Sequence, residues 1–482
     1  MWVFTYKFDT DGYLVKYKAR IVVRGDLQLP NQLDTYAATL AARIFRFLIA
    51  LTALGDLEAV QFDAINAFVN SPLDEEVYCS YPPGFEQEGS CLRLLRALYG
   101  LRRSPLLWYE LLTKALTQLG LKQLAGEEGC LFGNQYLIVF FYVDDIVVLY
   151  HKDNVQQFLN FRNELIAQFE LKELGELQWF LGIRVLRDRS RKELWLCQDS
   201  YIDKIASKFN IIKHNTSGYP PMPLPIEALS ANQEKANPQE IHAYQRRIGS
   251  ILYTAIVTRP DIAFASSKLS QFLQNPSPRH HQAADRTLAY LFGTKNYAIR
   301  YSAAESPILT CSSDASYGDN PDRCSSDGFL FKLAGGPIDW KATKQQAVTT
   351  STTEAELLAI SKAARELLYW KRVISSINQL NVLPQSLKLD PTQAVLQCDN
   401  QQTIGLLNKE TPKISTKLRH VDIHQHWLRQ EAQSGRIHIQ WVPTTQMPAD
   451  GLTKPLSAQK QQSFLQQLNL TDISYLLNQQ QK

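Results

Sequence analysis

The sequence lacks the patterns that mark several classes of protein. No two cysteines stand in C-x-x-C spacing, which argues against a structural zinc site, and their odd number argues against a disulfide framework. No apolar run reaches the roughly 18 residues of a membrane span, and the start MWVFTYKFDTDG turns polar too soon for a signal peptide. We therefore expect a soluble, intracellular protein in a reducing compartment, without a membrane partner. The seven cysteines are Cys79, Cys91, Cys130, Cys197, Cys311, Cys324 and Cys398.

A strong net charge is also absent. The net charge is only +4 over 482 residues, so the overall charge does not by itself indicate a nucleic-acid partner. The basic residues are unevenly placed, because 93–103 carries four arginines and no acid, and 184–192 carries four arginines and a lysine against Asp188. Such patches suit phosphate backbones, although each taken singly is equally well explained as a solvated face. The length predicts two to four domains, since one core cannot serve so long a chain.

The stretch YLIVFFYVDDIVVLY, residues 136–150, places two adjacent carboxylates in an apolar hairpin. Leu137–Val143 and Ile146–Tyr150 are rich in β-branched and aromatic residues and are predicted strands, with Asp144 and Asp145 at the turn. Neighbouring ionised carboxylates repel each other in an apolar setting, so the pair indicates a divalent metal. The alternative is an Asp-rich turn, although tight turns favour Asn-Gly or Asp-Gly, which tolerate positive φ.

The N-terminal residues 1–24 predict a basic ribbon. Two strands are expected around a turn at Asp9–Gly12, with the second strand at Tyr13–Val23. Even-numbered positions share one face of a strand, which suits a grip on phosphates, although an edge ribbon protected by charge has the same pattern. The basic residues on that face are Lys16, Lys18, Arg20 and Arg24.

Periodicity predicts two further blocks of structure around a linker at 213–240, which contains five prolines. The first block is expected to hold a helix at Ala41–Leu54, a short strand ending at Asp63, a helix from Ser104 with Pro105 at its first position, a helix at Asn154–Phe169, and paired strands at Trp179–Val185 and Glu193–Cys197. The second is expected to hold helices over Ile241–Leu291 broken at Arg259–Asp261, strands at Ile308–Ser313, Ser326–Leu333, Pro337–Lys341 and Gln345–Thr350, a helix at Thr353–Ile374, and a strand at Ala394–Cys398. This βββαβα order is typical of a mixed α/β layer.

Nine segments stand in a specific order along the chain. They are YKARIVVRG (Tyr17–Gly25), QFDAINAFVN (Gln61–Asn70), EEVYCSYPPGF (Glu75–Phe85), ALYGLRRSPLLWY (Ala97–Tyr109), YVDD (Tyr142–Asp145), WFLGIRV (Trp179–Val185), TRPDIAFA (Thr258–Ala265), TSTTEAEL (Thr350–Leu357) and MPADGLTK (Met447–Lys454). Each is weak or moderate alone. Together, from Trp2 to about Pro455, they resemble the reverse transcriptase and ribonuclease H portion of copia-type LTR retrotransposon (Pseudoviridae) Pol polyproteins.

The resemblance implies a polymerase site in which Asp63, Asp144 and Asp145 hold two Mg²⁺ ions, with Mn²⁺ as an alternative. One metal would lower the pKa of the primer 3′-hydroxyl, and both would stabilise charge at the α-phosphate of an incoming nucleotide. Phe68 would stack on the sugar and exclude a 2′-hydroxyl, although core packing explains it equally well. The substrate-binding residues implied in this way are Lys18, Arg20, Arg24, Phe68, Arg103 and Tyr142.

The resemblance also implies a second two-metal site, which directs water at an RNA phosphate. Its ligands would be Asp314, Glu356, Asp399 and Asp450. Three of them have a bland alternative, which is a capping role for Glu356 after Thr353 and an N-cap role for Asp399 and for Asp450.

Glu354 and Glu356 compete for one ligand position. Glu356 lies on a helical stripe with Ile360, Ala363 and Leu367, so it is expected to face the sheet. Glu354 stands three residues after Ser351, where a capping-box glutamate belongs.

Two features depart from the family pattern. Arg103 stands where the family usually has Gln, near the expected incoming nucleotide and template, so Arg103→Gln is expected to raise the extension rate. The loop between Trp441 and Asp450 lacks the histidine of cellular and retroviral ribonucleases H, and a structural or surface role is expected for His420 and His424.

We therefore predict an α+β protein, a right-hand polymerase with palm, fingers and thumb, followed by a helical connection and an RNase H-like mixed α/β domain. The expected domains are fingers, palm and the start of the thumb at 1–212, the Pro-rich linker at 213–240, a helical thumb or connection at 241–305, the RNase H-like domain at 306–455 and a Gln-rich tail at 456–482.

The predicted function is RNA-directed DNA polymerase and hybrid ribonuclease activity in retrotransposon replication. One alternative is a degenerate remnant that at most binds nucleic acid, which is favoured by Arg103, the start within the fingers and the missing protease and integrase portions. A second alternative is a protein with nuclease activity alone. The seven expected carboxylates favour an active enzyme. Expected partners are an RNA template, a DNA primer and product, RNA–DNA hybrid, deoxynucleoside triphosphates, and the integrase and capsid proteins of the same element. The expected location is the cytoplasm, in a virus-like particle, or the nucleus.

Overall fold

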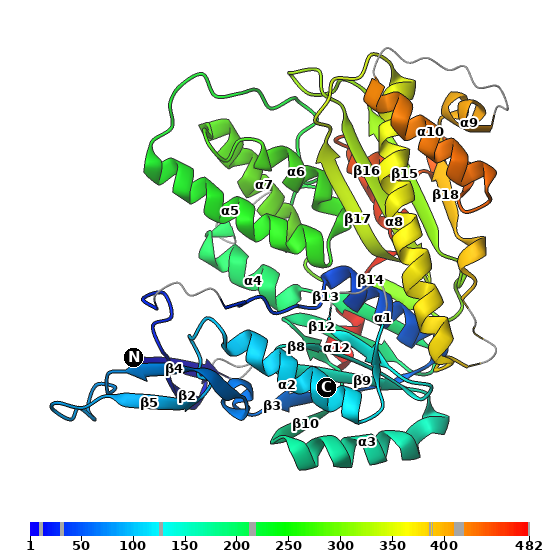
Figure 1. Ribbon diagram of the computed structural model, residues 1–482. Coiled ribbons are helices and arrows are strands. Elements are labelled where there is room, and N and C mark those ends of the chain that lie inside the picture. Colours follow the sequence, from blue (N-terminus) through cyan, green and yellow to red (C-terminus); the bar gives the residue numbers. More distant parts are fainter. Residues whose placement is uncertain are drawn as a thin grey trace. The chain divides into compact units, whose positions relative to one another are not determined.

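The structure is a computed structural model that describes residues 1–8, 13–28, 33–124, 129–211, 218–384, 387, 389–408 and 419–480 (Figure 1). The chain divides into two compact units. Unit 1 comprises Met1–Leu40, Glu58–Leu177 and Leu380–Val382, and unit 2 comprises Ala41–Leu57, Gln178–Gln379 and Leu383–Lys482. Among the described residues, no helix combines the length and the apolarity that crossing a bilayer requires.

The described residues of unit 1 form a six-stranded sheet in the order β10-β3-β9-β8-β7-β6, and two ribbons, β1-β2 and β4-β5. Its elements are β1 (Trp2–Phe8), β2 (Leu14–Ile21), β3 (Glu58–Ala64), η1 (Ala67–Asn70), β4 (Pro72–Cys79), β5 (Leu92–Arg96), α2 (Ser104–Gln118), β6 (Lys122–Gln123), β7 (Leu131–Gly133), β8 (Leu137–Tyr142), β9 (Asp145–Tyr150), η2 (Lys152–Asn154), α3 (Val155–Gln168) and β10 (Leu171–Glu176).

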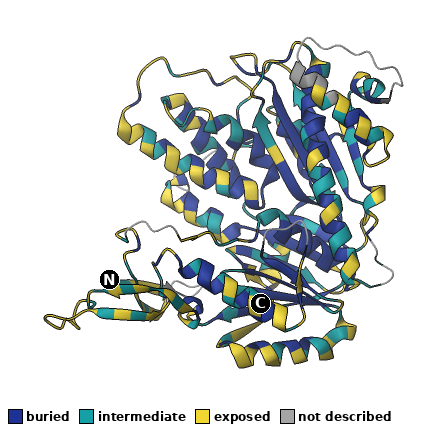
Figure 2. Cartoon of the chain, in the orientation of Figure 1, coloured by how far each residue is buried: buried dark blue, intermediate teal, exposed yellow. Residues whose placement is uncertain are grey.

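Helices α2 and α3 cover one face of this sheet. The ring of Phe158 on α3 lies 4.3 Å from that of Tyr150, and the ring of Tyr109 on α2 lies 6.1 Å from that of Phe141. Successive strand residues point to opposite faces, so the other face carries Asp63 and Asp145, which are cross-strand partners. The sheet centre is buried whereas the ribbons are largely exposed (Figure 2).

The N-terminal ribbon forms as the alternation predicts. Strand β1 pairs with β2 in antiparallel register from Trp2↔Ile21 to Phe8↔Leu14, and the turn expected at Asp9–Gly12 lies outside the described residues. Lys18 and Arg20 are half-buried, whereas Lys16 is exposed. The basic face is therefore partly covered at its C-terminal end.

The described residues of unit 2 form two five-stranded sheets. One has the order β11-β12-β13-β14-β20, and the other has the order β17-β16-β15-β18-β19, in which the pairs β15–β18 and β18–β19 are parallel. The elements are α1 (Ala42–Gly55), β11 (Trp179–Phe180), β12 (Ile183–Asp188), β13 (Glu193–Cys197), α4 (Asp199–Lys208), α5 (Pro238–Val257), η4 (Pro260–Ile262), α6 (Ala263–Ser270), α7 (Pro278–Gly293), β14 (Tyr297–Ser302), β15 (Thr310–Ser316), β16 (Ser326–Leu333), β17 (Gly336–Lys344), α8 (Thr352–Leu380), η5 (Pro391–Gln393), β18 (Val395–Cys398), α9 (Gln401–Asn408), α10 (Arg419–Gln433), β19 (His438–Trp441), η6 (Thr444–Gln446), η7 (Pro448–Leu452), α11 (Ala458–Gln467), β20 (Leu470–Asp472) and α12 (Ser474–Gln480).

The predicted break at Arg259–Asp261 has a side-chain cause. Arg259 and Asp261 form a fully buried ion pair at 2.7 Å, and Tyr290 of α7 donates its hydroxyl to Asp261 at 2.8 Å. A buried charge needs a partner and hydrogen bonds, so the chain between α5 and α6 is fixed by these contacts. Gln461 of α11 donates to the Tyr290 hydroxyl oxygen at 3.2 Å and joins the same network.

One segment differs from expectation, and the Gln-rich tail contains regular structure. The strand expected at Gln345–Thr350 is wrong, because these described residues form an irregular lead into α8, where the backbone N–H of Thr350 donates to Glu354. Residues 456–482 are structured up to Gln480, because β20 pairs with β14.

The boundary between the units falls near Gln178 rather than in the proline-rich linker. The reason is the pairing of β13 with β14, which ties 183–197 to a strand about a hundred residues later.

Candidate active sites

The hairpin of unit 1 turns one residue earlier than predicted. Strand β8 ends at Tyr142 and pairs with Asp145, the first residue of β9, so the turn residues are Val143 and Asp144. Val143 has a φ of +56°, which costs roughly 1–3 kcal/mol for a non-glycine residue and persists only where surrounding structure enforces it. Trp108 of α2 supplies that restraint, because its indole N–H donates to the Val143 carbonyl at 2.6 Å.

Three carboxylates meet at this turn. Asp63 pairs with Asp145 in the β3–β9 register, and the backbone N–H of Ala64 donates to the Asp144 carbonyl at 2.9 Å. Burial raises the pKa of Asp144, and the charge of Asp63 raises it further. Burial likewise raises the pKa of Asp145, against a 3.0 Å hydrogen bond from Gln61 that lowers it. A positive charge placed among these three carboxylates would therefore be stabilised.

Basic and aromatic residues surround Asp144. Lys18 and Arg20 both lower its pKa, which places their charges near the carboxylate. The Arg20 guanidinium lies 6.0 Å from the centroid of the Tyr99 ring, which in turn lies 4.7 Å from that of Phe68. Phe68 is therefore packed against Tyr99 in the vicinity of the carboxylates. Its role at a nucleotide sugar stays a prediction.

The other predicted substrate residues have protein partners or lie on the hairpin. Arg24 is exposed and forms an ion pair with Asp26 at 2.6 Å. Tyr142 is half-buried opposite Asp145. Their contacts with substrate also stay predictions.

Arg103 is held by the protein itself. Its side chain is 8% exposed, its Nε donates to Asp74 at 3.1 Å and its Nη2 donates to the other oxygen of the same carboxylate. Its Nη1 donates to the Asp34 carbonyl at 2.6 Å. The Asp74 hydrogen bond raises the pKa of Arg103. The cation at this position therefore has a counter-ion, and it links the start of α2 to β4.

We expect Arg103→Gln to destabilise unit 1 by about 1–3 kcal/mol, because glutamine cannot replace the bidentate bond and leaves Asp74 without its partner. Urea denaturation of the purified variant measures this loss, and Arg93→Gln, which removes the exposed pair with Glu76, is the matched control. An Arg103→Gln protein as stable as the unmodified chain would contradict the structural role.

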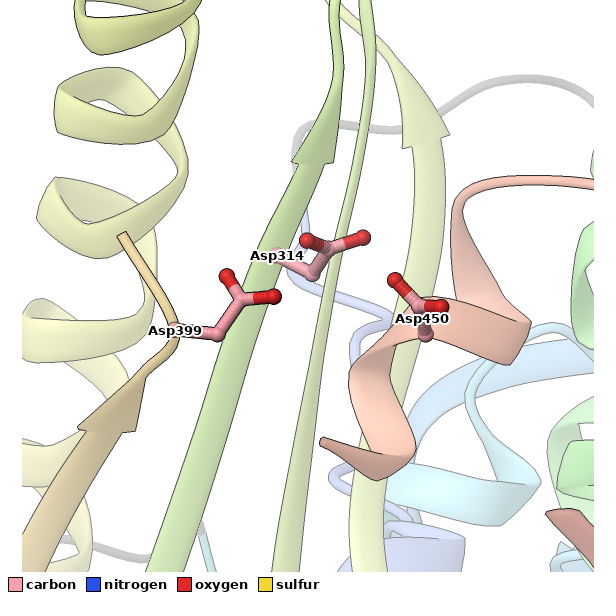
Figure 3. Close-up of side chains that lie close together, drawn as sticks. All are labelled: Asp314, Asp399 and Asp450. Carbon is pink, nitrogen blue, oxygen red and sulfur yellow. The ribbon is translucent and has the colours of Figure 1, made fainter. Parts of the chain in front are cut away.

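The second group of carboxylates contains Asp314, Asp399 and Asp450, whose side chains lie close together (Figure 3). Asp314 lies on β15, Asp399 directly follows β18, and Asp450 lies in η7. One oxygen from each lies within 4.8 Å of the others. Within the described part of the chain this is the one such group, so Asp63, Asp144 and Asp145 are less closely drawn together. Parallel pairing of β15 and β18 brings Asp314 and Asp399 to the same edge of the sheet.

Glu356 of α8 stands beside this group. It is 6% exposed, and the backbone of Ala315 forms a hydrogen bond that favours its charged form. Its Oε2 is buried without a hydrogen-bond partner among the described residues. Burial raises the pKa of Glu356 well above its usual range, and the charges of Asp314 and Asp399 add to the rise.

Burial also raises the pKa of Asp314, to about 6, and the charges of Asp450 and Asp399 act in the same direction. Hard oxygen donors with an orphaned buried oxygen are the donor set that a divalent cation completes. The residues at this site therefore fit a divalent metal.

Polar neighbours orient the carboxylates. Thr444 donates to Asp399 Oδ2 at 2.7 Å, Thr453 donates to Asp314, and Lys454 Nζ lies 2.5 Å from Asp450 Oδ1. These residues, like Gln61, Tyr99 and Trp108 in unit 1, were not predicted from the sequence. The ion pair between Asp450 and Lys454 could have been predicted from the sequence, because residues four positions apart lie on the same side of a helical turn.

The structure shows which residues cap α8 and α9. Glu354 is the capping residue, because its N–H donates to Ser351 Oγ at 3.2 Å and its carboxylate accepts from Thr350 at 2.7 Å. Asn400 rather than Asp399 caps α9, since its Oδ1 accepts from the N–H of Thr403 at 3.0 Å. His424 has a structural contact at 3.0 Å with Ser361, as expected. The side chain of His420 lies outside the described residues.

Comparisons with known proteins agree with the ordered motifs. The family profile described as Reverse transcriptase (RNA-dependent DNA polymerase) matches residues 1–223. The Retrovirus-related Pol polyprotein from transposon TNT 1-94 of Nicotiana tabacum is 32% identical over 481 residues, covering 95% of this chain and 34% of the relative. A transposon Ty5-1 protein of Saccharomyces cerevisiae is 32% identical over 317 residues, covering 63% of this chain and 100% of the relative.

Among solved structures, the foamy viral protease-reverse transcriptase in complex with double-stranded DNA aligns with a TM-score of 0.47 and 14% identity, covering 89% of this chain and 63% of that chain. The chain spans about a third of the length of the full Pol polyproteins that it matches. On the profile match, the relative that is covered along its whole length and the motif order, the chain belongs to the copia-type LTR retrotransposon Pol polyprotein family, as its reverse transcriptase and ribonuclease H portion.

Proposed function

We propose that the chain is an RNA-directed DNA polymerase joined to a nuclease that cleaves the RNA strand of RNA–DNA hybrids, each with its own Mg²⁺-binding carboxylates. The observation that carries the proposal is the presence of two carboxylate groups on two separate sheets. One group lies at the strained β8–β9 turn of unit 1, and the other lies where β15, β18 and η7 of unit 2 meet.

The metal ligands would be Asp63, Asp144 and Asp145 in unit 1, and Asp314, Glu356, Asp399 and Asp450 in unit 2. When bound, the metal ions supply Lewis-acid activation of the attacking oxygen and charge stabilisation at the phosphate, the two-metal role.

The chain's own residues prepare the polymerase site. Gln61 donates to Asp145 and orients it, and Trp108 fixes the turn that presents Asp144. Lys18 and Arg20 place positive charge beside Asp144, which suits a triphosphate or a template phosphate. Phe68, held by Tyr99, would contact the sugar of the incoming nucleotide.

At the nuclease site, Thr444 and Thr453 orient Asp399 and Asp314. The unpartnered Oε2 of Glu356 is available to accept a hydrogen bond from the attacking water. Preorganised groups of this kind lower the reorganisation needed in the reaction.

The substrates that follow are an RNA template, a DNA primer, an RNA–DNA hybrid and deoxynucleoside triphosphates. Retrotransposon replication would place the protein in a cytoplasmic virus-like particle or in the nucleus, with the integrase and capsid proteins of the same element as partners. The sequence pattern of Lys16, Lys18 and Arg20 along β2, with Arg24 three residues after that strand, supports a nucleic-acid partner.

Primer extension and hybrid cleavage test the proposal directly. The purified chain is expected to extend an oligo(dT) primer on poly(rA) with Mg²⁺ and to cut a labelled RNA strand only when that strand is paired with DNA. A chelator should stop both reactions. Failure to extend under these conditions would sink the polymerase part, and equal cutting of single-stranded RNA would sink the hybrid nuclease part.

A further inference from the structure

Lys454 lies at the edge of the carboxylate group that Asp314, Glu356, Asp399 and Asp450 form in unit 2. Lys454 lies two residues after the end of η7, and its Nζ lies 2.5 Å from Asp450 Oδ1. The Lys454 side chain is 39% exposed and that of Asp450 is 16% exposed, so the ion pair lies at the boundary between the group and solvent. The sequence places the two residues four apart, a spacing that brings side chains together on a helical turn.

The ammonium acts on more than its nearest partner. Asp450 shares its group with Asp314 and Asp399, because one oxygen from each of the three carboxylates lies within 4.8 Å of the others. The ion pair with Asp450 therefore places the Lys454 ammonium beside the whole group. Lys454 therefore offsets part of the negative charge that four neighbouring carboxylates concentrate.

We propose that Lys454 is a built-in counter-cation of the nuclease site, which pairs with Asp450 in the metal-free protein and leaves Asp450 when a divalent cation binds. The inference rests on the proposed metal site and concerns the competition for Asp450. A divalent cation bound to Asp450 would lie close enough to the Lys454 ammonium for the two positive charges to repel each other. The Asp450 carboxylate therefore cannot bind both cations at full strength.

The side chain of Lys454 has the means to move. Lysine is a compact point charge on a flexible four-carbon stem, and its partial exposure opens a path to solvent. Once released from Asp450, its ammonium is a donor for a backbone phosphate of bound RNA–DNA hybrid. Lys454 would thus be a positioning residue, which keeps the carboxylates together without metal and binds substrate with metal.

Metal affinity tests the competition without any turnover. Free Mn²⁺ is measured by electron paramagnetic resonance during titration of the full chain, and the binding lost in Asp399→Asn identifies the nuclease site. In Lys454→Met the Kd of this site for Mn²⁺ is expected to fall about tenfold, because the competing cation is gone. Lys454→Arg, which keeps the charge, should stay within about twofold of the unmodified chain.

Lys344→Met is the matched control. Lys344 Nζ also lies 2.5 Å from an aspartate oxygen, that of Asp322, and this pair lies outside the carboxylate group. Its loss should leave the Kd for Mn²⁺ unchanged. A second readout is the KM for hybrid, which should rise in Lys454→Met at saturating metal because a phosphate contact is lost.

Two results would overturn the inference. If Lys454→Met binds Mn²⁺ with the same or a higher Kd while Asp399→Asn still removes a site, the counter-cation role is wrong and the proposed metal site stands. If the unmodified chain and Asp399→Asn bind equal amounts of Mn²⁺, the proposed nuclease site fails and the inference fails with it. Lys454→Gln replaces the methionine variant if that protein does not fold.

Discussion

Asp144→Asn is expected to reduce primer extension about a thousandfold or more and to leave hybrid cleavage within about twofold. Asp144 sits on the two-residue turn of the β8–β9 hairpin, where Asp63 and Asp145 are its acidic neighbours. Asparagine keeps the size of the side chain but removes the charge that would hold a cation in the proposed site. Extension on poly(rA) and cleavage of a labelled hybrid, measured on one preparation, give both numbers.

The control is Asp153→Asn, which alters an exposed carboxylate just beyond β9. This variant should extend and cleave as the unmodified chain does. Loss of both activities in Asp144→Asn would show that the two carboxylate groups do not act independently. Extension at the normal rate would show that Asp144 is only a turn residue.

The hairpin was largely predictable because its signal is local. Runs of β-branched and aromatic residues predicted both strands, and the adjacent carboxylates predicted a metal site at the turn. The position of the turn was not predictable, because it depends on Trp108, whose indole donates to Val143 from 35 positions earlier in the chain. This distant donor helps to hold the positive φ of Val143, a β-branched residue.

Arg103 shows the same limit at a single position. Its place in a motif predicted a location near the nucleotide and a gain from Arg103→Gln. The structure gives the guanidinium Asp74 as its partner, 29 positions earlier. Periodicity carries no information about a side-chain pair between β4 and the start of α2, so the expected loss of stability could be derived only from coordinates.

Glu354 and Glu356 show where the spacing of residues in the sequence is sufficient to assign their roles. Helical spacing alone separated the capping glutamate, Glu354, from Glu356, which was expected to face the sheet, because both assignments depend on residues within one or two turns. The Gln-rich tail is the opposite case. Its composition predicted no particular element, and β20 pairs with β14, a strand more than 160 residues earlier.

Asp399→Asn is expected to reduce cleavage of the hybrid's RNA strand about a thousandfold or more while primer extension survives. Asp399 contributes an oxygen to the group with Asp314 and Asp450. The variant keeps an oxygen that accepts from Thr444, so the local fold is retained and the lost charge is the main change. Asp203→Asn, which removes a carboxylate paired with Lys295, is the control and should keep both activities.

The metal-free stability of Asp399→Asn separates a lost ligand from a damaged fold. Asp314 has a pKa of about 6, raised from 3.8 by burial and by neighbouring charges that include Asp399. A group with a raised pKa stabilises the folded state fully only below its unfolded pKa, and the contribution is lost as pH rises through the folded value. Removing the Asp399 charge lowers that folded pKa. Asp399→Asn should therefore unfold at a higher temperature than the unmodified chain above about pH 6, with the difference shrinking toward pH 4. A lower unfolding temperature at neutral pH would mean that the loss of cleavage reflects a disrupted fold rather than a missing ligand.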